Sequence, residues 1–452
     1  MVTNVVSFVV VICLLILIHE WGHFVVARLS GVGVERFSIG FGPVLWRVKR
    51  RDTEYCLSAI PMGGYVKMMG DDENPLEGGR TDTVDPARAF NLKPVWSRFL
   101  IVFAGPGMNF VLAFVILSSL PIIVGRAEQP SVVSEVAERG PAAEAGLRPG
   151  DRITAVDGRP VEHWSQVLKR VQEVRGAPVT LTVERGGQAL SLTLKPQRST
   201  GYDPIGDKKE TWDLGVGDAR AVPAKVGEIV PGMPAEKAGL KPGDLVVGVM
   251  GQPVGSWQEM AGIINKRAGQ ATTLSIRRGA DTVAITVTPE SVDGAGRIGI
   301  GPAPSLPDNI VYVRTWNPLS AASDGFAQTA SLTSLTVKAF WRLLTGRISP
   351  ASLGGPIQIA VAAGQSAKLG MPQLMFFTAL VSVNLAVLNL LPVPMLDGGH
   401  LLFFGCEAAM GRPISVRKRE IAQQVGFVLL MMLMVFALYN DVSRLGWLHF
   451  LR

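Results

Sequence analysis

The chain has 452 residues, of which 48% are hydrophobic, and its mean hydropathy of +0.29 is typical of a protein with several membrane spans. Its 50 Gly and 30 Pro residues indicate substantial non-helical segments as well. The formal net charge is +7, but no basic stripe alternates with aromatic residues. The charge therefore predicts contact with a lipid surface and argues against a nucleic-acid partner.

The first apolar segment, Val5 to Leu29, contains the spacing of a metal site. His19 and His23 are four residues apart, so on a helix they share a face and can bind one zinc ion, with Glu20 beside them as general base. An ionisable group near the bilayer centre costs about 2.5 to 3.5 kcal/mol, so this cluster needs a partner or a function. The alternative is a cytosol-facing helix end with two unrelated histidines. Because the segment lacks the features of a cleaved signal peptide, we expect it to be retained.

The loop that follows shows the alternation of β-strands. Val34 to Val48 and Glu54 to Met68 alternate on either side of a short turn, which predicts a hairpin. Gly63 and Gly64 have no side chains and permit close approach of another backbone, so we take them as candidate substrate-binding residues. A simple cytosolic loop is the alternative.

Three further segments are candidate membrane spans. Phe99 to Val124 and Ile421 to Tyr439 contain no charged residue, whereas Leu374 to Met395 is broken by prolines. Basic residues concentrate in the loops between spans one and two and between spans three and four, so both loops are expected in the cytoplasm. The region from about 126 to 370 then lies outside the cytoplasm. None of the three cysteines falls in it, and no disulfide framework is implied.

The outer region contains an internal repeat. Residues 146–196 align without a gap to 239–289, with 17 identities in 51 positions, and the shared motif is Gly-Leu-x-Pro-Gly-Asp. The repeats resemble PDZ domains of bacterial proteases, which implies that they bind extended peptides by adding a strand to a sheet edge. A plain structural spacer is the alternative. About nine extra residues precede Leu214 in the first copy, so the two grooves are expected to differ.

A zinc hydrolase needs a third protein ligand, and Asp397 is the candidate. Pro392 and Pro394 interrupt the third span shortly before it, so its carboxylate can turn toward a partner helix. His400 is an alternative ligand, although a capping or packing role fits it better. His163 and His449 have no motif partner and are expected to be structural.

Two asparagines precede the proline break. Asn384 and Asn389 can hydrogen-bond an exposed backbone, or they can serve interhelical packing; the residues alone leave both open. Farther upstream, Trp316 to Leu344 has the pattern of an interfacial or peripheral helix.

Taken together, the zinc pattern, the Gly-Pro pair with Asn109, the paired repeats and the Asn-x-x-Pro-x-Pro-x-x-Asp-Gly segment resemble the bacterial site-2 intramembrane metalloproteases. The resemblance implies that His19, His23 and Asp397 bind one Zn²⁺ per chain and that Glu20 is the catalytic base. It assigns the asparagines of the third span to substrate handling and the hairpin to a sheet that re-enters the membrane.

The resemblance also implies partners and a location. The substrates would be single-pass membrane proteins already trimmed by another protease, such as an anti-sigma factor in an envelope stress pathway, or remnant signal peptides. The repeats would act as a size filter on the periplasmic side of the bacterial inner membrane, with the active site toward the cytoplasm.

The expected fold is a multispanning α-helical membrane protein with four transmembrane helices, two inserted α+β PDZ-like domains and a membrane-associated β-hairpin. Its expected segments are helix one (1–29), the hairpin loop (30–97), helix two (98–125), the two repeats (126–220 and 221–305), an interfacial segment (306–370), helix three (371–405), a cytoplasmic loop (406–420), helix four (421–441) and a tail (442–452).

Two function classes compete with an intramembrane protease. A zinc transporter would use His and Asp within the membrane, but it should line a path with several such residues, and the spans contain this one cluster. A non-catalytic membrane scaffold that captures peptides with PDZ domains would not need Glu20.

Overall fold

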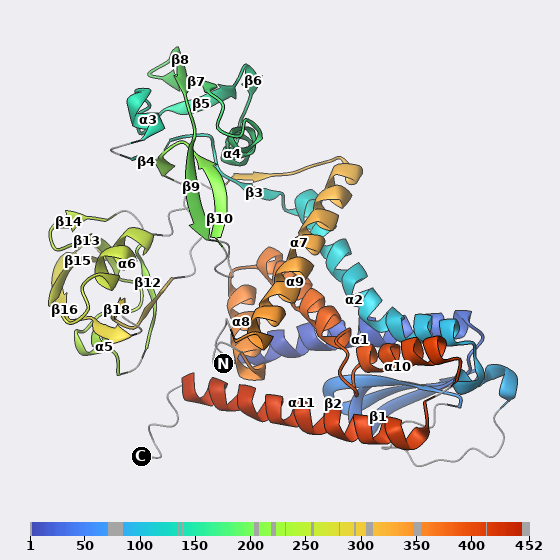
Figure 1. Cartoon of the computed structure of the whole chain (residues 1–452). Helices are drawn as coiled ribbons and strands as arrows, with labels where there is room; N and C mark the ends of the chain where they lie inside the picture. Colours follow the sequence, from blue (N-terminus) through green and yellow to red (C-terminus); the bar gives the residue numbers. More distant parts are fainter. Residues whose placement is uncertain are drawn as a thin grey trace. The chain divides into compact units, whose positions relative to one another are not determined.

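The structure is a computed structural model that describes residues 2–70, 85–133, 135–137, 140–202, 208–217, 223–230, 232–254, 257–279, 281–292, 295–303, 311–346, 354–412 and 414–444. The chain divides into two compact units, one formed by Met1–Gly125 with Arg314–Arg452 and the other by Arg126–Val313. Figure 1 shows that the first unit is mainly helical and the second mainly β-sheet. The predicted site residues all belong to the first unit.

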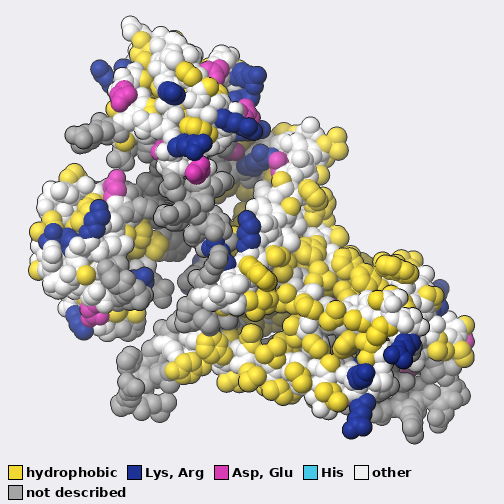
Figure 2. Space-filling model, in the orientation of Figure 1, with side chains coloured by type: hydrophobic (Ala, Val, Ile, Leu, Met, Phe, Trp, Pro, Cys, Tyr) yellow, Lys and Arg dark blue, Asp and Glu magenta, His cyan; other side chains and the backbone are white. Residues whose placement is uncertain are grey.

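Four helices of the first unit are long and apolar enough to cross a membrane, as the sequence predicts. They are α1 (Val2–Leu29), α2 (Val95–Ile123), α9 (Met371–Asn389) and α11 (Val416–Arg444). Many of their apolar side chains face outward, and Figure 2 shows hydrophobic side chains over much of the visible face of this unit. Outward apolar side chains over long helices fit a lipid environment.

The third span is shorter than the predicted Leu374 to Met395. Helix α9 ends at Asn389, and the next helix, α10 (Asp397–Met410), begins only at Asp397. Pro392 and Pro394 lie in the break, where proline lacks an amide donor and disfavours helical geometry in the residue before it. The break therefore sets Asp397 at the start of a new helix.

Two more helices complete the first unit. Helix α7 (Pro318–Leu344) begins at Asn317, whose side chain accepts hydrogen bonds from the amides of Leu319 and Ser320. It packs against α2 and α9, and α8 (Pro356–Lys368) packs against α1, α9 and α11. The segment before α2 contains two short 3₁₀ turns, η1 (Pro86–Arg88) and η2 (Phe90–Leu92).

The long hairpin of β1 (Val34–Arg50) and β2 (Thr53–Met68) pairs antiparallel around the turn at Arg51 and Asp52. The first half of β1 pairs with β2 on both of its sides, since Arg36 lies opposite both Lys67 and Glu54. The hairpin therefore bends back so that its two halves pair with each other. It contains register shifts that the sequence pattern did not predict. This doubling brings the Gly63–Gly64 segment alongside α1.

The two repeats have the same sheet order and two helices at matching positions in the chain. The first contains β6 (Arg159–Pro160), β5 (Arg152–Val156), β7 (Val179–Arg185) and β8 (Gln188–Leu194), with α3 (Pro141–Glu144) and α4 (Trp164–Glu173). The second contains β14 (Gln252–Pro253), β13 (Leu245–Val249), β15 (Thr272–Arg278) and β16 (Asp281–Val287), with α5 (Pro234–Lys237) and α6 (Trp257–Asn265).

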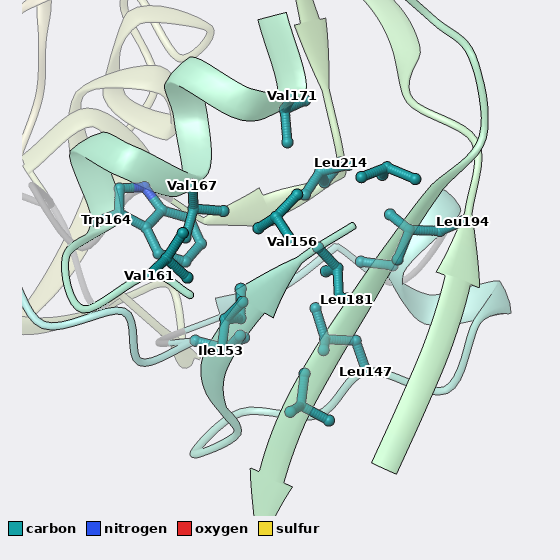
Figure 3. Close-up of a cluster of buried hydrophobic side chains, with 14 residues drawn as sticks. Leu147, Ile153, Val156, Val161, Trp164, Val167, Val171, Leu181, Leu194 and Leu214 are labelled. Carbon is teal, nitrogen blue, oxygen red and sulfur yellow. The ribbon is translucent and has the colours of Figure 1, made fainter. Parts of the chain in front are cut away.

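Each repeat has its own hydrophobic core between sheet and helix. In the first, Trp164 and Val167 of α4 point toward Val156 and Leu181 of the sheet (Figure 3). The second buries Met260 and other apolar residues in the same way. Alternating apolar residues on the strands and an apolar face on the helix account for both cores.

The aspartate of the shared motif is hydrogen-bonded to an arginine in each repeat. Asp151 is 1% exposed and accepts two hydrogen bonds from Arg185 at 2.6 Å each, and a third from the amide of Arg148 at 2.8 Å. Asp244 and Arg278 repeat the arrangement at 2.8 Å. The hydrogen bonds from the arginine lower the pKa of each carboxyl group.

The two repeats differ before Leu214, where the sequence of the first has about nine extra residues. The first contains the ribbon of β9 (Gln197–Tyr202) and β10 (Lys208–Asp213), and Gln172 of α4 exchanges two hydrogen bonds with the backbone of Trp212. The second has the shorter pair β17 (Glu290–Val292) and β18 (Ala295–Arg297). The remaining pairs are β3 (Arg126–Glu128) with β20 (Val311–Val313), β4 (Glu135–Val136) with β11 (Val216–Gly217), and β12 (Val226–Ile229) with β19 (Ile300–Pro302).

Candidate metal centre

Helix α1 presents the two motif histidines on one face. His19 and His23 are each 8% exposed, and their Nε2 atoms lie 3.2 Å apart. This is the geometry that one helical turn gives to residues i and i+4. Both rings therefore point to one location.

Helix α10 brings the third donor to the same location. The Asp397 carboxylate has Oδ2 3.2 Å from His19 Nε2 and Oδ1 3.6 Å from His23 Nε2. Donor atoms of these three residues lie within 4.8 Å of one another, and no other such group of three occurs in the described part of the chain. Two histidines and a carboxylate are a known donor set for catalytic zinc, with the fourth position left for water.

The backbone around Asp397 contains one strained residue and two glycines. Met395 has a φ of 95°, a left-handed conformation that is strained for a side chain with a Cβ. A Cβ at Gly398 would overlap the carbonyls of Leu390 and Leu391, and one at Gly399 would lie 2.5 Å from the carbonyl oxygen of Val393. Glycines therefore allow α10 to start tightly against the break.

The protonation pattern of His23 fits a metal ligand. Its Nδ1 lies 2.8 Å from the backbone oxygen of Ile101, which can only accept, so Nδ1 carries the proton. The neutral ring then has its lone pair on Nε2, which faces the other two donors. A Cβ at Gly105 of α2 would overlap this Nε2, so glycine leaves the space beside the donors open. The residues present fit a zinc ion.

The general-base candidate lies beside the folded hairpin. Glu20 is partly buried, and a Cβ at Gly64 would lie 3.0 Å from its Cγ and 2.8 Å from the backbone oxygen of Ser38. Gly63 has a φ of 139° and leaves room for the ring of Phe41. The structure thus brings this glycine segment next to the glutamate.

One of the two asparagines of α9 is hydrogen-bonded to a neighbouring helix. Asn384 accepts a hydrogen bond of 2.7 Å from Thr336 of α7, which is the interhelical packing that the sequence left open. Asn389 is partly buried at the end of α9. His400 is not among the converging donors, His163 precedes α4 in the other unit, and His449 lies outside the described residues.

One polar contact of this site had no predicted role. Asn109 of α2 is fully buried, its Nδ2 lies 3.2 Å from His19 Nδ1, and its backbone oxygen accepts a hydrogen bond of 2.7 Å from Ser382 of α9. An asparagine in an otherwise apolar span was the available signal, because polar groups in membrane helices are costly and usually paired.

Comparison with known proteins matches residues 7–433 to the model for peptidase family M50. The regulator of sigma-E protease RseP from Escherichia coli is 39% identical over 97% of this chain and 98% of its own length. A protein from Neisseria meningitidis, whose name describes a zinc metalloprotease, is 37% identical over 97% of this chain and 98% of its own. The PDZ domain of an SdrC-like protein from Listeria innocua is 25% identical, covering 20% of this chain and 91% of that one, with a TM-score of 0.16.

The predicted family is thereby confirmed, and so is the predicted class of enzyme. The match spans the motif of α1, the break before α10 and the region between them. This chain belongs to peptidase family M50, the site-2 type of membrane zinc metalloprotease.

Proposed function

We propose that this chain cleaves a peptide bond within the membrane-spanning segment of a single-pass membrane protein, with one zinc ion per chain held by His19, His23 and Asp397. The observation that carries the proposal is the convergence of these donors from α1 and α10, inside a unit whose four long helices are apolar enough to cross a bilayer. A catalytic donor set among such helices is suited to substrates that the membrane itself contains.

The chemistry divides between the ion and Glu20. Bound zinc would supply a Lewis acid for the scissile carbonyl and for the attacking water. Glu20, next to His19 on α1, would take a proton from the attacking water and return it to the departing amine. Glu20 is partly buried, which limits the access of bulk water to this proton transfer.

An unwound substrate is required because a helix hides each carbonyl in an i to i+4 hydrogen bond. We propose that the Gly63–Gly64 segment of β2 pairs with the extended substrate next to Glu20, since a sheet edge offers free backbone donors and acceptors. Asn389, at the end of α9, is proposed to bond the same exposed backbone. Asn384 is the weaker candidate, because Thr336 already donates to its side-chain oxygen.

The repeats are proposed to select substrates on the outer side of the membrane. A groove in the second repeat is lined by Trp257, Met260 and Ile264 of α6 and by the Ile298–Gly301 segment. A helix beside a strand is the arrangement with which PDZ domains hold extended peptides. Deleting residues 130–300 should release cleavage of untrimmed substrate, and unchanged selectivity would contradict this role.

The location follows from the loop charges. We propose that the chain resides in a bacterial inner membrane, with the repeats on the periplasmic side and the active site toward the cytoplasm. Trimmed anti-sigma factors are the proposed substrate class, since an Escherichia coli relative is named as a regulator of sigma-E protease. Remnant signal peptides are a second class of the same chemistry.

The decisive experiment replaces Glu20 with Gln in the full-length chain. The variant should bind zinc and fold as the parent does, while cleavage of a model transmembrane substrate falls by about 100-fold or more. Retained cleavage would favour a role that does not use Glu20, as in a peptide-binding scaffold. Zinc uptake into sealed vesicles that survives the substitution would favour a transporter.

A further inference from the structure

Asn109 joins three helices at the metal centre. Its side chain reaches His19 of α1, and its backbone oxygen accepts from Ser382 of α9. Asn109 and Ser382 are both 0% exposed, so neither group exchanges its partner for bulk water. A fully buried amide in an apolar helix is costly unless it has a specific partner.

The two histidines are held from the same helix. The carbonyl of Ile101 accepts from Nδ1 of His23, and eight residues farther along α2 the side chain of Asn109 faces Nδ1 of His19. Gly105, midway between them, lets α2 approach the rings. Two groups about two turns apart on α2 thus each contact the Nδ1 atom of one of the histidines, which are one turn apart on α1.

The orientation of the Asn109 amide decides which nitrogen of His19 can bind a metal. With Nδ2 facing the ring, the amide donates to Nδ1, and the neutral imidazole must carry its proton on Nε2, the atom that faces Asp397. In that orientation Oδ1 is buried without a hydrogen-bond partner among the described residues. Amide oxygen and nitrogen are interchangeable by a half-turn of the side chain.

We infer that Asn109 is a positioning residue that presents Oδ1 to His19 Nδ1–H when zinc is bound, so that the Nε2 lone pair points to the metal. It gives His19 the kind of acceptor that the Ile101 carbonyl gives His23. The inference rests on the zinc ligands proposed above. An amide suits this place because a half-turn of its side chain changes it from a donor to an acceptor for His19 Nδ1.

Zinc affinity of the full-length chain, measured by competition with a chelator, tests this. Asn109→Leu should weaken zinc binding about 10- to 100-fold, because leucine has a similar size but no acceptor for the orienting hydrogen bond. The side chain of Asn109→Asp can accept but not donate when ionised, so this variant should bind zinc with an affinity within roughly 3-fold of the parent's. Equal loss in both variants, or no loss in Asn109→Leu, would overturn the inference.

Two controls separate this inference from folding and from the proposed function. Ser118→Ala changes a partly buried α2 side chain whose buried Oγ has no hydrogen-bond partner among the described residues, and it should leave zinc affinity unchanged. In the zinc-loaded parent, the ¹⁵N spectrum of labelled histidine should show His19 protonated at Nδ1. A proton on Nε2 of zinc-loaded His19 would refute the inference without any mutation. A parent chain that binds no zinc would instead refute the proposed function.

Discussion

The buried aspartates of the two repeats and the partly buried Asp397 of the helical unit have different partners. Asp151 and Asp244 each lie in a repeat with an arginine that donates two hydrogen bonds, so the cation is part of the fold. Asp397 is approached by two imidazoles, and no lysine or arginine pairs with it among the described residues. A buried carboxylate with its own arginine has its charge compensated within the fold, whereas a partly buried one that faces two imidazoles is suited to an external cation.

The helical unit contains both kinds. Glu407, on the same helix as Asp397, lies 2.6 Å from Arg98 of α2, and both side chains are about nine-tenths buried. The Arg98 guanidinium also lies over the ring of Phe404, 5.0 Å from its centre. This pair ties α10 to α2, and its presence shows that the membrane unit can build in a cation where structure requires one.

The largest expected effect is that of Asp397→Asn. Removing a proposed zinc ligand should abolish peptide cleavage and weaken zinc binding by more than the roughly 10- to 100-fold that loss of an orienting partner costs. Asp151→Asn is the matched control, because it changes a buried aspartate of a repeat and should leave zinc affinity unchanged. Metal analysis and a cleavage assay on both variants provide the measurement, and zinc retained at full affinity by Asp397→Asn would break the distinction.

Arg98→Met should produce the largest loss of stability. It removes the closer cation of Glu407 and leaves only Arg419, 3.9 Å away, so the loss should approach the about 3 to 5 kcal/mol of unfolding free energy that breaking a buried ion pair costs. Adding Glu407→Leu removes the poorly paired charge and should recover most of the loss. Denaturant unfolding in detergent micelles measures both, and a double variant as unstable as Arg98→Met would contradict the pairing argument.

Asp151→Ala should have a smaller and local effect. It removes the acceptor of the Arg148 amide and of Arg185, which costs about 2 kcal/mol in the first repeat. Hydrogen exchange of the intact chain should show faster exchange in β5 and β7 and unchanged protection in the second repeat. Asp244→Ala should give the mirror result, and an effect spread equally over both repeats would argue against independent cores.

The smallest effect is the pH dependence of the repeats. Hydrogen bonds from arginine lower the pKa of Asp151 and Asp244 below the unfolded value of about 3.9. Their stabilisation is therefore fully present above that value and is lost as pH falls through the folded pKa. Stability of the repeats should stay level between about pH 7 and 5 and decline below about pH 4, less steeply when both aspartates are Asn. An identical acid decline in that double variant would assign it to other groups.

Local features of the site could be predicted from sequence, and interhelical ones could not. The spacing of His19 and His23 follows from one helical turn, and the prolines indicated the break before Asp397. The contact of Asn109 with His19 depends on the packing register of α1 and α2, which no local pattern encodes. The ligand and substrate roles of the predicted residues remain predictions.

The fold shows the same division. Apolar length predicted the four candidate spans, and alternation around Arg51 predicted the strands of the hairpin. The second partner of Arg36 was not predicted, because a simple hairpin pairs Arg36 with Lys67 and Glu54 with Lys49, and alternation alone does not indicate the added pairing of Arg36 with Glu54. Helix α8 was missed within the expected interfacial segment, since its many Ala and Gln residues give a weak apolar pattern.

X-ray absorption at the zinc edge of catalytically active, full-length chain tests the central claim most directly. The account predicts one zinc per chain with two imidazole nitrogens at about 2.0 to 2.1 Å and oxygen ligands at about 2.0 to 2.2 Å, and loss of one imidazole in His23→Ala. Active protein without bound metal, or a zinc shell that is unchanged in both His23→Ala and Asp397→Asn, would contradict it.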